Sequence, residues 1–498
     1  MKLKSRISTF LDNSTKDYPV LYILAAGLYP FLHFYNSNLS IADSITQCLM
    51  LVLVCFILPI FLWIISKKLI KLKVFSFFKN SYVSILNIGT FSMLLSILIF
   101  HLNKKELLIV LIIASILGFL LFKHLKKIVI LQLLLAVISF FTFTPKAWFA
   151  LQQDNNDWAL ISKPMLEAKL NYKPNIFVIQ PDGYVNSVEL KKSPYNYDNS
   201  EFEGWLKQQN FTMYDDFRSN YYSTLTSNSS MFAMKHHYYS NTNRSTLKTH
   251  NANNVIVGND NNVLKILKNN NYRTHLFTDN SYFLTNRRDV FYDYCNVPNS
   301  DVHYFDTGRV NGIDIVSDFS KTLDTLSKTW NFFFIEKTIP SHIMYDKQRT
   351  KGAKQERVEY LERLEMTNEW LKSLIYEIHQ FDSNAMIVIV ADHGGYVGLE
   401  YTMEVVNRKL KPIEVISSFS SILSVKWPQN IESQNLEFKT NVNLFYNIFY
   451  ALSGDEVFID NLQANTSFLP LIENGKVLYY ECIDEYKNTV FKPIDTLH

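Results

Sequence analysis

The stretch that decides the fold is an apolar strand followed by polar residues, and it reads Met386-Ile387-Val388-Ile389-Val390-Ala391-Asp392-His393-Gly394-Gly395. An unbroken run rich in β-branched residues is typical of a strand buried on both faces of a sheet. Open α/β sheets place their sites at the carboxyl ends of such strands. There an aspartate followed at once by a histidine can offer two ligands to one divalent cation. Because Asp-His-Gly is also common in ordinary loops, the remaining ligands must come from elsewhere in the chain.

A second strand of the same kind is expected at residues 174–184, where an apolar run ends in Asp182 and Gly183. Helical and extended patterns alternate after it, which predicts a mostly parallel central sheet with helices on both faces. Helices are expected at about 199–209, from 224, at 261–269 and at 353–380, and strands at 211–215, 272–277, 331–336 and 413–418. Residues 240–262, rich in Asn, Thr and Ser, are expected to form a surface loop.

Hydroxyl side chains are dense between the two acidic strand ends, around Thr224. Such residues are often simple helix caps. A hydroxyl at a helix amino terminus is also well placed to act on an anion, because the helix dipole and the free amides favour negative charge there. A bound metal would lower the pKa of that hydroxyl and make it a nucleophile toward phosphorus. Asp182, Thr224, Asp392 and His393 therefore form a candidate set of ligands.

The first 145 residues differ from the rest of the chain because they contain five long apolar runs. Each run approaches the roughly 20 residues that a helix needs to cross a bilayer, and none has an acidic residue at its centre. The runs lie at about 18–35, 44–66, 82–100, 106–122 and 128–144. This pattern predicts a transmembrane domain of five helices over residues 1–145 and disfavours a single cleaved signal peptide.

Basic residues set the expected orientation of these helices. Lys2, Lys4 and Arg6 precede the first run and lysine clusters follow the second and fourth runs, whereas the loop at residues 36–42 has no Lys or Arg. By the positive-inside rule the amino terminus is cytoplasmic, and five crossings deliver the residues after Thr144 to the outer face. The sequence thus predicts a multi-pass protein of the inner (plasma) membrane with an extracytoplasmic, periplasmic domain.

Charge is divided unevenly along the chain. Residues 1–150 hold 15 Lys and Arg against 4 Asp and Glu, which leaves 34 against 42 for the remainder. The basic excess belongs to membrane loops, and the acidic remainder excludes a nucleic-acid-binding function. Residues 146–173 mix tryptophans with charges and are expected to form a connector at the bilayer surface. In this topology Cys295 and Cys482 face an oxidising compartment, which permits a disulfide between them.

The order Asp182-Gly183, then the Thr224 region, then Asp392-His393-Gly394 resembles the alkaline phosphatase and sulfatase superfamily. The preceding apolar runs resemble its membrane branch, which includes the lipoteichoic acid synthases, the phosphoglycerol transferases and the lipid A phosphoethanolamine transferases. The segment after Ser223 is similar to the nucleophile segment of phosphoethanolamine transferases, whose threonine carries a phosphoryl intermediate. The resemblance implies an alkaline-phosphatase-like, sulfatase-like catalytic domain at residues 174–498. It makes Thr224 the nucleophile, and Asp182, Thr224, Asp392 and His393 the metal ligands.

The segment that follows the expected strand at 331–336 resembles the histidine-bearing loop of the same superfamily. This resemblance implies that His342 contacts the transferred phosphate or protonates a leaving group. His236, His237 and His275 have no counterpart in the resemblance and are expected to be packed or solvated.

Several departures from the family patterns narrow the expected chemistry. The chain has no Cys/Ser-x-Pro-x-Arg segment, which sulfatases need to form formylglycine, so hydrolysis of sulfate esters is disfavoured. Most of the transferase branches carry a glutamate in place of Asp182, and phosphoethanolamine transferases flank their threonine with cysteines that are missing around Thr224. The histidine that two-metal members carry shortly after the Asp-His pair is also missing. This favours a single divalent ion, with zinc and manganese both suited to an Asp/Asp/His/Thr set.

These features support one main hypothesis and two alternatives. The main hypothesis is a membrane-anchored, metal-dependent transferase that moves a phosphoethanolamine or phosphoglycerol head group from a phospholipid donor to a cell-surface glycan or lipid, through a phospho-threonine. The first alternative is an extracytoplasmic phosphodiesterase or phosphatase that acts on surface polymers with water as acceptor. The second is a catalytically inactive scaffold in polysaccharide assembly, which the missing histidine favours.

Overall fold

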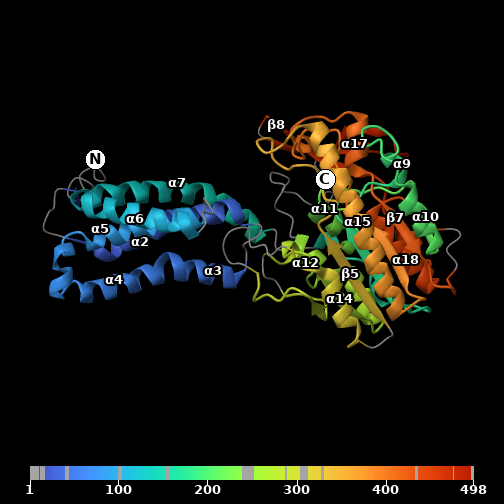
Figure 1. Cartoon of the computed structure of the whole chain (residues 1–498), viewed down its shortest axis with the longest axis horizontal. Helices are drawn as coiled ribbons and strands as arrows, with labels where there is room; N and C mark the ends of the chain where they lie inside the picture. Colours follow the sequence, from blue (N-terminus) through green and yellow to red (C-terminus); the bar gives the residue numbers. More distant parts are fainter. Residues whose placement is uncertain are drawn as a thin grey trace. The chain divides into compact units, whose positions relative to one another are not determined.

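A computed structural model of the chain describes residues 10–11, 17–39, 44–98, 104–152, 157–237, 252–285, 289–302, 312–326, 330–431, 436–474 and 476–494. The contacts between residues divide the chain into two units (Figure 1). The helical unit comprises Met1–Asp154, Thr285–Arg287 and Val302–Arg309. The α/β unit comprises Asn155–Leu284, Arg288–Asp301 and Val310–His498.

Helices coincide with all five predicted apolar runs in the helical unit. They are α2 (Pro19–Asn38), α3 (Ile45–Val52) continued by a π-helical turn (Leu53–Ile57) into α4 (Leu58–Leu69), α5 (Tyr82–Leu98), α6 (Lys104–Leu120) and α7 (Leu125–Gln152). Within the part of the chain that the structure describes, two helical stretches are long and apolar enough to cross a membrane, Ile45–Leu69 and Phe122–Trp148. That all five helices cross one remains a prediction.

A buried polar contact joins three of these helices. Asn87 of α5 and Gln132 of α7 exchange side-chain hydrogen bonds at 2.9 and 3.0 Å, and Asn87 also donates to the carbonyl of Tyr22 in α2. Helices that lie in lipid gain little from apolar burial against each other, so interhelical hydrogen bonds of this kind help to fix their packing. Large apolar side chains are exposed on these helices, such as Phe141, which is 70% exposed.

The α/β unit is built on a seven-stranded sheet in the order β2-β7-β6-β1-β5-β3-β4. Its strands are β1 (Ile176–Pro181), β2 (Phe211–Met213), β3 (Arg273–Thr278), β4 (Tyr294–Cys295), β5 (Asn331–Lys337), β6 (Met386–Val390) and β7 (Leu423–Lys426). The five strands from β6 to β4 are parallel, and β7 and β2 are antiparallel at one edge. The predicted mostly parallel sheet is confirmed.

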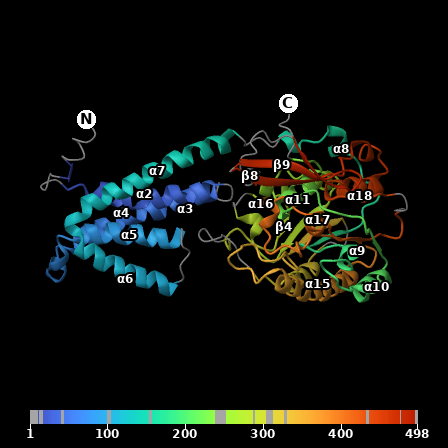
Figure 2. The same ribbon diagram turned by 90° about the horizontal axis from the view of Figure 1, so that it is seen from above.

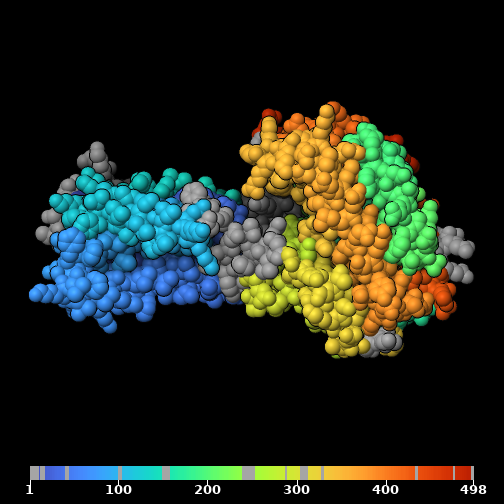
Figure 3. Space-filling model, viewed as in Figure 1, coloured from blue at the N-terminus to red at the C-terminus, as the bar shows by residue number. Residues whose placement is uncertain are grey.

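Helices cover both faces of this sheet (Figure 2), and the space-filling view in Figure 3 shows the outer surface of one of these helix layers. One face carries α10 (Ser200–Gln208), α14 (Ile315–Leu323) and α15 (Ala353–Phe381), and the other carries α11 (Thr224–Ala233), α13 (Asn262–Asn269) and α18 (Leu444–Ser453). Alternate residues of β5 point to the two opposite helix layers. Phe333 stacks on Phe177 at 4.4 Å on the first face, whereas Phe334 meets Phe232 of α11 at 4.9 Å on the second. Both faces are therefore apolar, which explains the unbroken apolar runs in the sequence.

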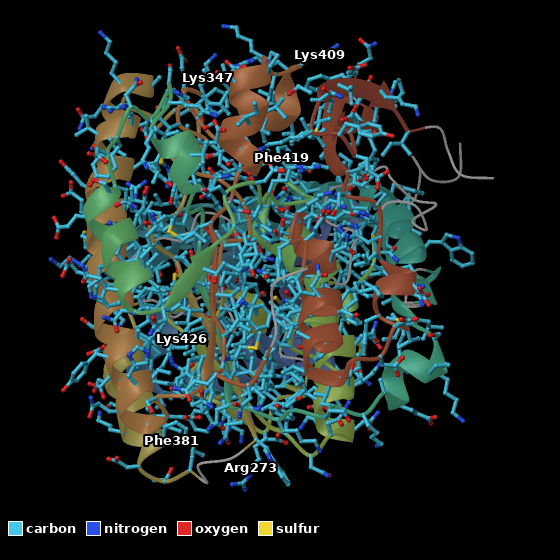
Figure 4. All side chains as sticks on the ribbon, turned by 90° about the vertical axis from the view of Figure 1, so that its right-hand side faces the viewer. Arg273, Lys347, Phe381, Lys409, Phe419 and Lys426 are labelled. Carbon is cyan, nitrogen blue, oxygen red and sulfur yellow. The ribbon has the colours of Figure 1, made fainter. Side chains whose placement is uncertain are left out.

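Figure 4 shows the two ends of the parallel strands. Arg273, at the start of β3, and Phe381, at the end of α15, lie on the side where the strands begin. Lys347, in the segment after β5, and Lys409 lie on the opposite side. The loops that follow the parallel strands gather on this second side, at the carboxyl ends of the strands, where α/β sheets place their sites.

One predicted strand is wrong. Residues 413–418 belong to helix α17 (Pro412–Phe419), although Ile413, Val415 and Ile416 suggest an extended segment. Pro412 at the first helical turn and Glu414, whose carboxylate accepts from the amide of Lys411 at 2.7 Å, start the helix. Proline and an acidic residue at these positions favour a helix start and outweigh the β-branched pattern.

A small antiparallel sheet completes the α/β unit. It consists of β8 (Ser467–Glu473), β9 (Lys476–Ile483) and β10 (Thr489–Pro493). The disulfide considered from the sequence does not form, because Cys295 on β4 and Cys482 on β9 are both free thiols.

The connector and the expected surface loop contain more helix than predicted. Helix α7 continues to Gln152, and α8 (Lys163–Glu167) follows within the segment 146–173. In the expected loop 240–262, residues 252–256 form α12 (Ala252–Ile256), where Val255 and Ile256 are fully buried. The first part of that loop lies outside the described residues.

Candidate metal centre and nucleophile

Asp182 and Asp392 follow two neighbouring strands of the seven-stranded sheet. β1 pairs in parallel with β6, with Ile179 opposite Ile389, so the two strands end at the same level. Asp182 is the first residue after β1, and Asp392 is the second after β6. Their side chains meet because parallel strands end at a common edge, and the two residues are only 3% and 0% exposed.

A backbone contact links the two strand ends. The amide of Gly183 donates to Asp392 Oδ1 at 3.1 Å. Gly183 has a φ of +70°, a conformation that glycine adopts without strain. The contact fixes one oxygen of the Asp392 carboxylate and leaves Oδ2 at 3.3 Å from His393 Nε2.

Gly394 and Gly395 allow the chain to leave the site through a crowded turn. A Cβ at Gly394 would lie 2.1 Å from the carbonyl oxygen of Ser417. A Cβ at Gly395 would lie 2.3 Å from the ring of Tyr360, whose hydroxyl donates to the carbonyl of Gly183 at 2.9 Å. The two glycines are thus required by close packing against neighbouring elements.

Thr224 is the first residue of α11, at the amino terminus of the helix. The hydroxyls of Ser223 and Thr226 bond each other at 2.8 Å, so neighbouring side chains satisfy one another at this helix start. The Thr224 hydroxyl instead lies 3.5 Å from Asp182 Oδ1 and 3.3 Å from His393 Nε2. The structure therefore brings together all four residues of the predicted set.

His393 lies between the two carboxylates. Its Nδ1–H donates to the carbonyl of Gly394 at 2.9 Å, which directs Nε2 toward Asp182 Oδ1 and Asp392 Oδ2, each 3.3 Å away. Burial lowers the pKa of His393, but Asp392 and Asp182 more than offset this and the net pKa is raised. Burial, and then the charge of Asp392, raise the pKa of Asp182 to about 7.

The three charged residues fit a divalent cation. Each of Asp182, Asp392 and His393 offers one carboxylate or imidazole ligand atom, and these three atoms lie within 4.8 Å of one another. Among the residues that the structure describes, no Lys or Arg pairs with either carboxylate, and the buried Asp392 Oδ2 makes no hydrogen bond. Two buried carboxylates with an unsatisfied oxygen need a compensating charge. Carboxylate, imidazole and hydroxyl ligands suit zinc and manganese alike.

His342 stands beside this set without joining it. Its ring centre is 6.2 Å from that of His393. Nδ1–H donates to the carbonyl of Ile343 at 2.6 Å, so the neutral ring offers Nε2 as a proton acceptor. Burial lowers the pKa of His342 to about 4, which keeps the imidazole neutral at neutral pH. That His342 contacts a transferred phosphate or protonates a leaving group remains a prediction.

Two further residues at the site were not predicted. Ser341, which has a φ of +60°, donates its amide to the carbonyl of Asp182 at 2.7 Å and bonds the Asp182 carboxylate with its side chain. The ring of Tyr396 lies 5.3 Å from that of His393 and 6.0 Å from that of His342, and it is 1% exposed. Ser341 adjoins His342 in the sequence and Tyr396 is three residues after His393, and that proximity was the only available signal.

The other histidines are packed, as expected. His237 stacks on Tyr221 at 4.2 Å, and His236 bonds the Tyr221 hydroxyl at 3.0 Å. His275 stacks on Phe333 at 4.6 Å. All three histidines are at most 5% exposed.

Several solved structures align with much of this chain at low sequence identity. The integral membrane lipooligosaccharide phosphoethanolamine transferase A of Neisseria meningitidis is 12% identical, over 87% of this chain and 95% of that one, with a TM-score of 0.38. The lipoteichoic acid synthase of Listeria monocytogenes is 14% identical, over 66% and 90%, with a TM-score of 0.40. The C-terminal periplasmic domain of EcEptC from Escherichia coli, in complex with zinc, is 12% identical, over 64% and 93%, with a TM-score of 0.40.

The comparison by sequence profile is more decisive. No curated protein matches the chain in a direct sequence search. The profile of the sulfatase family, however, matches residues 174–447, which is more than half of the chain and includes every residue of the predicted site. The chain belongs to the sulfatase family.

Proposed function

We propose that this protein is a membrane-anchored, metal-dependent transferase that moves a phosphoethanolamine or phosphoglycerol head group from a phospholipid to a cell-surface glycan or lipid. The observation that carries the proposal is the position of Thr224. Its hydroxyl stands at the start of a ten-residue helix, 3.5 Å from Asp182 Oδ1 and 3.3 Å from His393 Nε2. A nucleophile, an anion-favouring helix terminus and a cation site thus coincide.

The first half of the reaction forms a phospho-threonine. Thr224 Oγ1 attacks the phosphorus of the lipid phosphodiester, and Asp182 Oδ1, 3.5 Å away, accepts the hydroxyl proton. The bond from phosphorus to the diacylglycerol oxygen breaks, and that oxygen takes the proton that Asp182 accepted, so that diacylglycerol leaves as an alcohol. The amides at the start of α11 stabilise the negative phosphoryl oxygens.

The second half transfers the head group to the acceptor. A hydroxyl of the glycan or lipid attacks the phosphorus, and the bond to Thr224 breaks. His342 Nε2 accepts the proton of that hydroxyl, because its Nδ1–H is held by the carbonyl of Ile343. The proton then passes to Thr224 Oγ1, which restores the threonine hydroxyl. A divalent cation held by Asp182, Thr224, Asp392 and His393 would lower the pKa of the Thr224 hydroxyl and offset charge on the phosphoryl oxygens.

The test uses the full chain in lipid nanodiscs with phosphatidylethanolamine or phosphatidylglycerol. Release of diacylglycerol is measured for the wild type, Thr224→Ala and the control Thr212→Ala, which changes an exposed threonine of β2. We expect release to fall at least about 100-fold in Thr224→Ala, because the nucleophile is lost. It should remain unchanged in Thr212→Ala. Unchanged release in Thr224→Ala would overturn the proposal.

The fate of the head group separates transfer from hydrolysis. Mass spectrometry of surface glycans and lipids from cells with and without the protein should show a phosphoethanolamine or phosphoglycerol addition that requires Thr224. Release of free phosphoethanolamine or glycerol phosphate with unmodified acceptors would show a hydrolase instead. A protein that holds no stoichiometric metal and releases no diacylglycerol would be a scaffold.

A further inference from the structure

A cavity separate from the metal centre lies at the far end of α11. Its volume is about 350 Å³, within the range of small-molecule sites. All of its lining residues belong to the α/β unit. They are Trp158, Ile161, Ser162, Met165, Lys235, His236, Tyr446, Asn461 and Gln463. Figure 2 shows α8 and α18, which contribute to the lining, beside one another.

The cavity has a buried floor and a polar rim. Met165, His236 and Tyr446 form the floor, and none of them is more than 5% exposed. Ser162 and Asn461 are exposed at the rim. A floor with aromatic surface and a rim of hydroxyl and amide groups suits a ligand that has both C–H faces and hydroxyls.

The floor is fixed and uncharged. His236 Nε2–H donates to the carbonyl of Ala464 at 2.8 Å, while Nδ1 accepts from the hydroxyl of Tyr221 at 3.0 Å. The hydroxyl of Tyr446 donates to the carbonyl of Met234 at 2.8 Å. Because these polar groups are already paired, polar recognition of a ligand falls to the rim.

Lys235 gives the cavity its charge. It follows α11 directly, and among the described residues it forms no ion pair. None of the described residues that line the cavity is an Asp or a Glu. Ser162 also remains available, because it precedes α8 without capping that helix with its side chain. The ligand should therefore carry a negative charge, placed against the Lys235 ammonium.

We propose that this cavity binds an acidic sugar, one that carries a carboxylate on a pyranose ring. The carboxylate pairs with Lys235, the ring hydroxyls bond Ser162, Asn461 and Gln463, and the ring face packs on the aromatic surface. A phosphate group is a poorer fit, because phosphate sites usually combine arginine forks, several cations or helix amides. Lys235 is the one Lys or Arg among the described lining residues, and the α8 helix is only five residues long.

The position of this cavity suggests its use. α11 has ten residues, so Thr224 at its start and Lys235 beyond its end are roughly 15 Å apart along the helix axis. A glycan bound here would be held near the nucleophile without occupying the metal centre. This role in acceptor binding rests on the proposed transferase function, whereas acidic-sugar binding does not.

The test measures binding of sodium D-glucuronate to the detergent-solubilised full chain by isothermal titration and ligand-observed NMR. D-glucose is the neutral control ligand, and inorganic phosphate is the anion control. Lys235→Met keeps the apolar stem and removes the charge, and Lys169→Met changes an exposed lysine that does not line the cavity. Circular dichroism checks that both variants are folded.

We expect glucuronate to bind the wild type and Lys169→Met equally, and to bind Lys235→Met at least about tenfold more weakly. Thr224→Ala should bind glucuronate like the wild type, so loss of the proposed catalysis would leave this result intact. Absence of glucuronate binding, equal binding of glucose, or displacement of glucuronate by millimolar phosphate would each overturn the proposal.

Discussion

Asp182 and Asp392 place two carboxylates in a site that is almost closed to water. Their mutual repulsion and their burial raise the pKa of Asp182 to about 7, and Asp392 Oδ2 lacks a hydrogen bond. Replacement of one of these buried carboxylates by a neutral residue would increase the stability of the metal-free protein. The arrangement therefore destabilises the fold, and a bound divalent cation would offset that cost.

This view predicts opposite effects of Asp392→Asn with and without metal. With a chelator present, the variant should unfold at a higher temperature than the wild type, because one buried charge is removed while Oδ1 still accepts from Gly183. Zinc or manganese at about 1,000 times its Kd should stabilise the wild type by about 4 kcal/mol and the variant far less. Thermal unfolding by circular dichroism measures both effects. The control Asp460→Asn, at an exposed position, should behave like the wild type, and a wild type unaffected by either metal would refute the cation site.

At the scale of the elements, one contact couples the strand that carries Asp182 to the helix that carries Thr224. Gln180 of β1 and Asn228 of α11 exchange two side-chain hydrogen bonds, at 2.9 and 3.0 Å, and neither residue is exposed. Paired amides inside an apolar layer fix one register, because any shift leaves polar groups unsatisfied.

Removal of one amide should therefore lower the free energy of unfolding by leaving its partner unsatisfied, and removal of both should lower it by less than the two single changes added together. Gln180→Leu or Asn228→Leu alone should destabilise the protein by about 1–3 kcal/mol, since the remaining amide stays buried without its partner. The double variant should lose clearly less than the sum of the single losses. Denaturant unfolding of the three variants completes the cycle, with the exposed Gln208→Leu as control. Strict additivity would show that the pair does not act as a unit.

The elements also show what the sequence can and cannot predict. β5 and β6 were predicted almost to the residue and β1 within three residues at each end, because burial on both faces requires an unbroken apolar run. α17 was mistaken for a strand, since periodicity was weighed above the helix-starting signals at Pro412 and Glu414. β7, the actual strand in that region, has four residues, too few for a clear pattern.

The residues of the candidate site also differ in whether the sequence could predict them. Asp182, Asp392 and His393 could be selected because they follow buried apolar strands, and Thr224 because its segment lies at a helix start and resembles a known nucleophile segment. Tyr396 could not, because a tyrosine near a site has no pattern that separates it from core packing. Its φ of +62° and its position between two imidazoles depend on tertiary contacts that no local sequence encodes.

Buried histidines should make the stability of the α/β unit depend on pH. Burial lowers the pKa of both His236 and His275 to about 4, while the unfolded chain titrates near 6.5. Between these values the unfolded state binds more protons, so the free energy of unfolding is highest above pH 6.5 and falls as pH drops toward 4. Each histidine contributes roughly 3 kcal/mol to this fall. Denaturant unfolding at pH 7, 6 and 5 should show a shallower fall for His275→Phe, which keeps the ring stacked on Phe333. An unchanged slope would contradict this assignment.

The topology of the whole chain is open to direct labelling. If five helices cross the membrane, the segment after α4 is cytoplasmic and the α/β unit is outside. Val74 and Tyr486 are 82% and 86% exposed. A membrane-impermeant maleimide should therefore label Tyr486→Cys in intact spheroplasts and label Val74→Cys only after permeabilisation. The parent protein gives the background from its native thiols. The reverse pattern, or labelling of both variants from outside, would rule out the five-crossing arrangement.

The central claim is that Thr224 carries the transferred group, and peptide mass spectrometry tests it most directly. The metal-loaded full chain is mixed with phosphatidylethanolamine or phosphatidylglycerol in the absence of acceptor, quenched in acid and digested. We expect the peptide that contains Thr224 to gain the mass of a phosphoethanolamine or phosphoglycerol group, and the gain to be absent from Thr224→Ala. Diacylglycerol release by the wild type with the adduct on another residue, or turnover by Thr224→Ala at the wild-type rate, would contradict the account.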